Sequence, residues 1–223
     1  MIHYNYSPNQ LEEKALELLK HFDPERLSKN KPIDVYEVIE KCLDVQYDWK
    51  YLTPDQSILG MTAFRAGTLW VWPESHYEDG MLPTQIFVEE GTILIDSTLT
   101  ELPNRGAENF TVMHEVFHQV LHKRCFRHSN PDYTHCTARD ALKNGKRRPM
   151  TSLEICEYQA NTCAAAFLMP RSLLIEKVNR YAGDRLHLKS YADYMLAKDL
   201  AEEFSVSPTA MKYRLLNLGL AEQ

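Results

Sequence analysis

The pentapeptide HEVFH at residues 114–118 decides the fold and its chemistry. It lies in a helix predicted over residues 107–122, whose apolar side chains leave almost no polar face, so this helix is expected to be buried. Residues four apart lie about 40° round and about 6 Å along an α-helix, so His114 and His118 can reach one zinc ion. Glu115 would face the open coordination position as a general base. The motif therefore predicts metal-dependent peptide-bond hydrolysis.

A catalytic zinc needs a third protein ligand, and the best candidate is a carboxylate on the next predicted helix, residues 152–169. Glu157 lies on that helix, with Asn161 one turn later on the same face, where its amide can orient the carboxylate. His122 continues the face of the first motif, but it lies about 12 Å along the helix from His114. Because that distance is too long for one ion, we interpret His122 as a helix-end cation or as a group behind a ligand.

Other residues of ligand or donor type leave alternatives open. Tyr158, His122 and Arg171 are candidates for stabilising the oxyanion, and the sequence does not choose among them. A second metal site is conceivable on the loop that follows the first motif, but a solvated basic loop with incidental cysteines is the preferred interpretation. Its members would be Cys125, His128, His135 and Cys136.

Three segments in this order resemble the ImmA/IrrE family of bacterial metallopeptidases: FTVMHEVFH at 110–118, EYQAN at 157–161 and AAAFLMP at 164–170. The resemblance covers about residues 30–220, leaving a variable amino-terminal helix at 1–30. Phe117 stands where the family usually has glycine.

The resemblance implies a cytosolic zinc endopeptidase with one Zn²⁺ per chain. It assigns the ligand roles to His114, His118 and Glu157, and the role of catalytic base to Glu115. Family members typically cleave or inactivate a repressor protein, which relieves repression of a mobile element or a stress response. The implied partner is therefore a protein substrate, a DNA-binding repressor.

The flanking pattern predicts an α+β fold, mostly helical, with a small antiparallel sheet beside the zinc helices. Ser7 to Gln10 reads as a capping box that opens a helix ending near Phe22, and Asp34 opens a second, short helix. Strands are expected near residues 45–49 and in two hairpins. The predicted hairpins join 58–65 to 68–72 through Ala66-Gly67, and 85–89 to 92–96 through Glu90-Gly91.

The carboxy-terminal part, residues 190–219, has a helix-turn-helix pattern, which makes a transcription factor the rival class. Residues 190–223 hold 3 basic and 5 acidic side chains, whereas a duplex-binding protein must neutralise several phosphates. We therefore interpret these helices as packing elements of a single peptidase domain over 1–223, and direct nucleic-acid binding is not expected. A catalytically silent zinc-binding regulator remains the other alternative.

Composition agrees with a globular protein: of 223 residues, 44% are hydrophobic and 25% are charged, which excludes a disordered or coiled-coil chain. The net charge is −6, yet residues 123–149 hold 8 basic and 2 acidic side chains, giving +6. We read 123–151 as a long irregular excursion beside the cleft. With no signal peptide or membrane span in the pattern, and an odd set of 5 cysteines expected to be free thiols, a cytoplasmic location is predicted.

Overall fold

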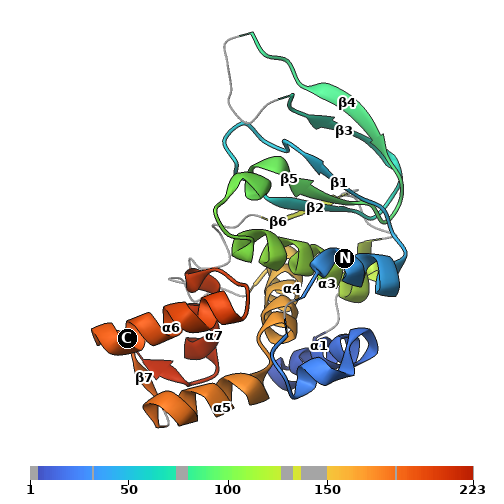
Figure 1. Cartoon of the computed structure of the whole chain (residues 1–223). Helices are drawn as coiled ribbons and strands as arrows, with labels where there is room; N and C mark the ends of the chain where they lie inside the picture. Colours follow the sequence, from blue (N-terminus) through green and yellow to red (C-terminus); the bar gives the residue numbers. More distant parts are fainter. Residues whose placement is uncertain are drawn as a thin grey trace.

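The structure is a computed structural model of the α+β class, as predicted, with a layer of strands above a group of helices (Figure 1). It describes residues 5–31, 33–73, 80–126, 150–183 and 185–222, and the backbone of 133–136. Most of the predicted basic excursion therefore lies outside the described residues. Three parts of it are described. Its first residues extend the helix of the HEVFH motif to Phe126, Tyr133–Cys136 is a strand rather than irregular chain, and Thr151 at its end caps the next helix.

The helices begin and end close to where the sequence predicts them. Ser7 and Gln10 form the capping box of the first helix, and Thr151 and Glu154 form another before the fourth. The α-helices are α1 (Pro8–Phe22), α2 (Val35–Val38), α3 (Gly106–Phe126), α4 (Ser152–Leu168), α5 (Arg171–Ala182), α6 (Tyr191–Glu203) and α7 (Pro208–Asn217). Short 3₁₀ or π turns are η1 (Pro24–Leu27), η2 (Ile39–Leu43) and η3 (Ser97–Glu101).

The first five strands lie where the sequence predicts them, but both predicted hairpins are wrong, and the strands at Tyr133–Cys136, Leu186–His187 and Ala221–Glu222 are not predicted. The main sheet has the order β1-β5-β2-β6, in which β5 pairs parallel with β1 and antiparallel with β2, while β3 pairs with β4 in a separate ribbon. The strands are β1 (Tyr47–Lys50), β2 (Gly60–Ala63), β3 (Gly67–Val71), β4 (Thr84–Val88), β5 (Ile93–Asp96), β6 (Tyr133–Cys136), β7 (Leu186–His187) and β8 (Ala221–Glu222).

Burial explains why neighbours in sequence do not pair. Strands β2 and β5 are buried on both faces, so they pair with each other in the centre of the sheet, whereas β3 and β4 each keep an exposed face. Gly91 has φ +96°, and its N–H donates to the carbonyl of Ala63 over 2.7 Å. The Glu90-Gly91 turn therefore leads the chain onto β2 rather than back along β4.

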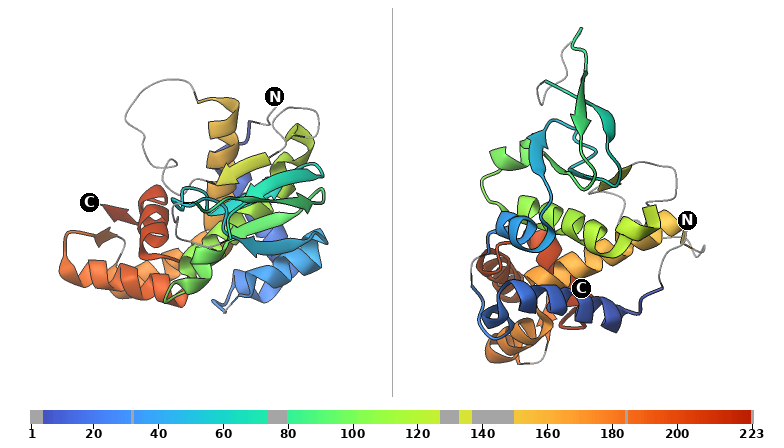
Figure 2. Two further views of the ribbon diagram at one scale, coloured as in Figure 1. Left: turned by 90° about the horizontal axis from the view of Figure 1, so that it is seen from above. Right: turned by 90° about the vertical axis from the view of Figure 1, so that its right-hand side faces the viewer.

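The sheet separates two apolar cores. Met61 and Ala63 of β2 face the β3–β4 ribbon, while Ile93 and Ile95 of β5 join the main core on the helical side. In that main core α3 runs beneath the sheet, α4 packs under α3, and α1 packs against α4 (Figure 1). The right view of Figure 2 shows the same layering, and the left view, from above, shows the carboxy-terminal helices grouped to one side of the sheet.

The carboxy-terminal helices are attached to the rest of the fold by buried polar contacts. Arg214 of α7 is 4% exposed, forms an ion pair with Glu12 of α1 and donates from Nε to the carbonyl of Met169. Asn109 of α3 donates to the carbonyl of Ser205 in the turn between α6 and α7. The helix-turn-helix is thus present, and it is packed against the helices of the core.

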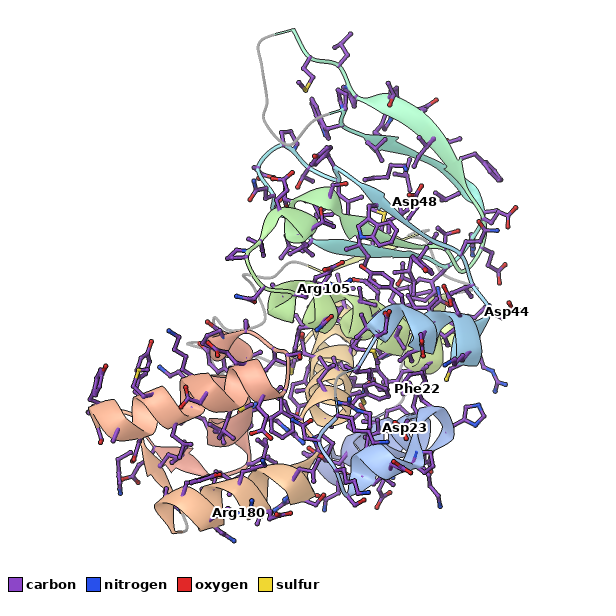
Figure 3. All side chains as sticks on the ribbon, viewed as in Figure 1. Phe22, Asp23, Asp44, Asp48, Arg105 and Arg180 are labelled. Carbon is purple, nitrogen blue, oxygen red and sulfur yellow. The ribbon has the colours of Figure 1, made fainter. Side chains whose placement is uncertain are left out.

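A second polar group ties α2 to the start of α3. The Tyr36 hydroxyl donates to Glu108, and Trp49 donates from its indole to the Tyr36 oxygen over 3.1 Å. Arg105, labelled in Figure 3 below the sheet, binds Glu108 over 2.9 Å and lies against the Tyr36 ring. These contacts fix the amino-terminal end of the helix that carries the histidines. No helix in the described part of the chain combines the length and apolar character of a membrane span.

Candidate active site

The central turns of α3 carry the predicted motif, between the sheet and α4. His114, Glu115 and His118 are each 0% exposed. Burial of three ionisable side chains is costly unless each has a partner, and the partners come from β2 on one side and from α4 on the other. The sandwiched position of α3 explains why its sequence is apolar nearly all round.

The three side chains predicted to hold the metal lie together. The Nε2 atoms of His114 and His118 are 2.8 Å apart, and Glu157 of α4 places Oε2 3.2 Å from His114 Nε2 and Oε1 3.3 Å from His118 Nε2. All three ligand atoms lie within 4.8 Å of one another. Burial would raise the pKa of Glu157, but its close contacts with the two histidines outweigh burial and hold that pKa well below its usual range.

Asn161 contacts a different partner from the one expected. Its Oδ1 lies 3.0 Å from His114 Nδ1, so the amide orients the histidine and not the carboxylate of Glu157. An amide oxygen can only accept, so this contact places the ring proton of His114 on Nδ1 and leaves Nε2 unprotonated. The sequence predicts a supporting role for Asn161 but assigns it to the wrong ligand.

His122 lies behind His118. Of the two interpretations offered from the sequence, this position agrees with a group behind a ligand. The two Nδ1 atoms are 3.0 Å apart, and His122 Nε2 lies 3.0 Å from Oε1 of Gln159 on α4. The pKa of His122 is lowered to about 3, mainly by burial and to a smaller extent by the nearby His118. Its ring is therefore neutral and is not a helix-end cation. Because Gln159 Oε1 takes the Nε2 proton, His122 Nδ1 accepts from His118, whose Nε2 is then unprotonated.

These contacts show that the residues fit a metal ion. Both histidines donate their Nδ1 protons away from the centre, so two unprotonated Nε2 atoms and an ionised carboxylate converge within a few ångströms. Like partial charges at such distances repel unless a cation lies among them. Two imidazole nitrogens and one carboxylate oxygen are also the donor set that catalytic zinc sites use.

Glu115 projects from α3 toward the sheet. Its Oε2 accepts a hydrogen bond of 2.6 Å from the Thr62 hydroxyl of β2, while its Oε1 has no partner among the described residues. Burial raises the pKa of this carboxyl. Sequence reasoning missed both Thr62 and Gln159. A signal was nevertheless available, because each is a polar residue on a face that is otherwise apolar.

The remaining candidates do not enter the centre. Tyr158 follows Glu157 but is 44% exposed. Arg171 begins α5, beyond the break at Met169 and Pro170 that ends the helix of Glu157, and it is exposed. The side chains of His128, His135 and Cys136, named for a second metal site, lie outside the described residues.

A family model matches the part of the chain that carries most of the side chains of this site. Residues 87–216 match the IrrE N-terminal-like domain of Peptidase_M78, a stretch that begins in β4 and ends in α7. No curated protein matches the chain. The match includes α3 and α4 with the His114, His118 and Glu157 centre, while β2 with Thr62 lies before it. Since the match spans more than half of the sequence, the chain belongs to the Peptidase_M78 family of metallopeptidases, whose substrates are proteins.

Proposed function

We propose that the protein is a zinc-dependent endopeptidase, in which His114, His118 and Glu157 hold the metal and Glu115 is the catalytic base. The observation that carries the proposal is the convergence of the three ligand atoms within 4.8 Å, with both ring protons directed away from the centre. A zinc ion in a site of this kind acidifies a water molecule and polarises the scissile carbonyl.

The protein's own residues supply the remaining steps. Glu115 takes the proton of the attacking water and passes it to the leaving amine. Its raised pKa suits the first of these roles, since a carboxylate that is a stronger base accepts the proton more readily. Asn161 and the His122–Gln159 pair keep the two imidazoles in the tautomer that presents Nε2 to the metal.

For the substrate, we propose a DNA-binding repressor, as the family resemblance implies, cleaved in the cytoplasm. The carboxy-terminal helices support a role as protease rather than direct DNA binder. They carry buried anchors such as Met211, Arg214 and Leu215, and their connecting turn is bonded to α3. The whole chain is therefore proposed to act as one peptidase domain.

The test is a comparison of Glu115→Gln with Glu154→Gln, which changes a carboxylate that caps α4. Purified protein should contain about one zinc per chain by elemental analysis in wild type and in both variants. Cleavage of labelled casein, and of repressors encoded beside the protein, should fall by about two to four orders of magnitude in Glu115→Gln only. Equal cleavage by Glu115→Gln and wild type would refute the mechanism, and bound zinc without cleavage by wild type would favour the silent regulator.

A further inference from the structure

The hydrogen bond that reaches Glu115 from the sheet points to a residue with a defined task in the proposed reaction. Thr62 is 0% exposed and lies in β2, on the face that is turned toward α3. Its hydroxyl lies 2.6 Å from Glu115 Oε2 and 3.3 Å from the Glu115 carbonyl. A hydroxyl has one proton, and the shorter distance identifies Oε2 as the atom that accepts it.

The second carboxylate oxygen is free because the strand leaves room for it. Oε1 of Glu115 is buried and has no hydrogen-bond partner in the described structure. A Cβ added to Gly60, two residues before Thr62 on the same face of β2, would lie 2.9 Å from that Oε1 and 2.7 Å from Thr111 Cγ2. The strand therefore binds one oxygen of the carboxylate and, through a glycine, leaves space at the other.

We propose that Thr62 is a positioning residue for the catalytic base: by binding Oε2, it fixes the carboxylate of Glu115 so that Oε1 is the atom that accepts the proton. The proposal rests on the proposed peptidase function and extends it, because it assigns different tasks to the two oxygens of one side chain. Thr62 itself touches neither the metal ligands nor the substrate in this scheme. Gly60 is the second element of the same arrangement, since any side chain there would displace Oε1.

The kinetic test uses two substitutions of Thr62 and one control. Thr62→Val keeps the shape and removes the hydroxyl, Thr62→Ser keeps the hydroxyl, and Thr92→Val removes a buried threonine hydroxyl beside β5. With labelled casein as the probe, Thr62→Val should lower kcat about 10- to 100-fold, the range expected for a hydrogen bond to a charged group, with KM and zinc content unchanged. Thr62→Ser should stay within about threefold of wild type, and Thr92→Val should retain full kcat.

The same substitution of Thr62 in a protein that already lacks the base distinguishes positioning of Glu115 from a merely structural role of Thr62. In Glu115→Gln protein, where the base is already lost, Thr62→Val should change the residual rate by less than about twofold. An equal loss in both backgrounds, or a serine variant as slow as the valine variant, would overturn the proposal.

A readout without catalysis separates this proposal from the proposed function. In metal-free protein, urea unfolding of Thr62→Val, Glu115→Ala and the double variant should give a coupling of about tenfold in the unfolding equilibrium constant. That coupling is expected even if wild type cleaves nothing, in which case the peptidase proposal fails while the contact stands. Additive effects of the two substitutions would show that Thr62 does not hold Glu115 and would overturn the assignment.

Discussion

Replacing His122 by phenylalanine is expected to weaken zinc binding, although this residue does not reach the metal centre. The substitution keeps a ring in a site that is 1% exposed, where the His122 ring packs 6.4 Å from Phe126 and 5.1 Å from His118, measured between centroids. It removes the acceptor of the 3.0 Å contact with His118 Nδ1. Without that acceptor, the His118 ring is free to carry a proton on Nε2, the atom that must be unprotonated to bind metal.

The magnitude follows from the loss of one buried hydrogen bond. Such a bond contributes about 0.5–1.5 kcal/mol net, and loss of a partner that orients a metal ligand typically costs about 10- to 100-fold in affinity. Since about 1.4 kcal/mol corresponds to a factor of ten, the two ranges meet near a tenfold loss. We therefore expect the zinc dissociation constant of His122→Phe to rise about tenfold.

Competition with a chromophoric chelator at neutral pH measures that constant directly. The control is His21→Phe, which changes an exposed histidine at the end of α1 and should bind zinc as wild type does. His122→Asn can place an amide oxygen near the position of Nδ1 and should recover part of the affinity. Wild-type affinity in His122→Phe, with melting of the metal-free protein unchanged, would refute the tautomer argument.

Three further outcomes are expected. Glu157→Ala should lose most of its zinc by elemental analysis, whereas Glu154→Ala, which removes a carboxylate that caps α4, should keep it. The reverse pattern would place the third ligand one helical turn earlier. Gly106→Ala should lower the free energy of unfolding by about 1–3 kcal/mol, because the added Cβ would clash with the backbone of Val206 and Ser207. Urea titration measures this change. An unchanged midpoint would show that the turn between α6 and α7 does not contact the start of α3. Burial raises the pKa of Cys156 and of Cys163 to about 12, so both stay protonated at pH 8 and should react with iodoacetamide more slowly than half-buried Cys42 in the folded protein. Mass spectrometry of timed samples measures the order, and labelling of Cys163 before Cys42 would contradict it.

Local signals in the sequence are sufficient to predict the helices and the side chains that meet in the His114, His118 and Glu157 cluster. Ser7 and Asp34 are recognisable as caps because capping depends on residues only two or three apart, and the spacing of His114 and His118 is fixed by the helix itself. Glu157 is recognisable as a candidate ligand because a carboxylate on the buried face of a helix is costly unless it has a partner, and the neighbouring histidine motif supplies one.

Features that depend on distant pairing are not predictable in the same way. Residues 66–67 and 90–91 have turn chemistry, yet that chemistry marks only where a strand ends, and burial on both faces decides which strands become neighbours. The same limit applies to Asn161. Its face is evident from the sequence, but whether its amide meets a carboxylate or an imidazole depends on how α3 and α4 pack.

The close approach of Gly106 to the turn at Val206 limits how the protein can be divided. A fragment that stops before α6 would uncover the first turn of α3, where Asn109 would also lose the carbonyl of Ser205. The helix that carries the histidines would then lose one of the two sets of contacts that hold its first turn, and would keep only those of Arg105 and Glu108 with Tyr36. Protein engineers who wish to attach a reporter or a targeting module should therefore retain α6 and α7 in every truncated version, and should treat the helix-turn-helix as an indivisible portion of the peptidase rather than as an exchangeable cassette.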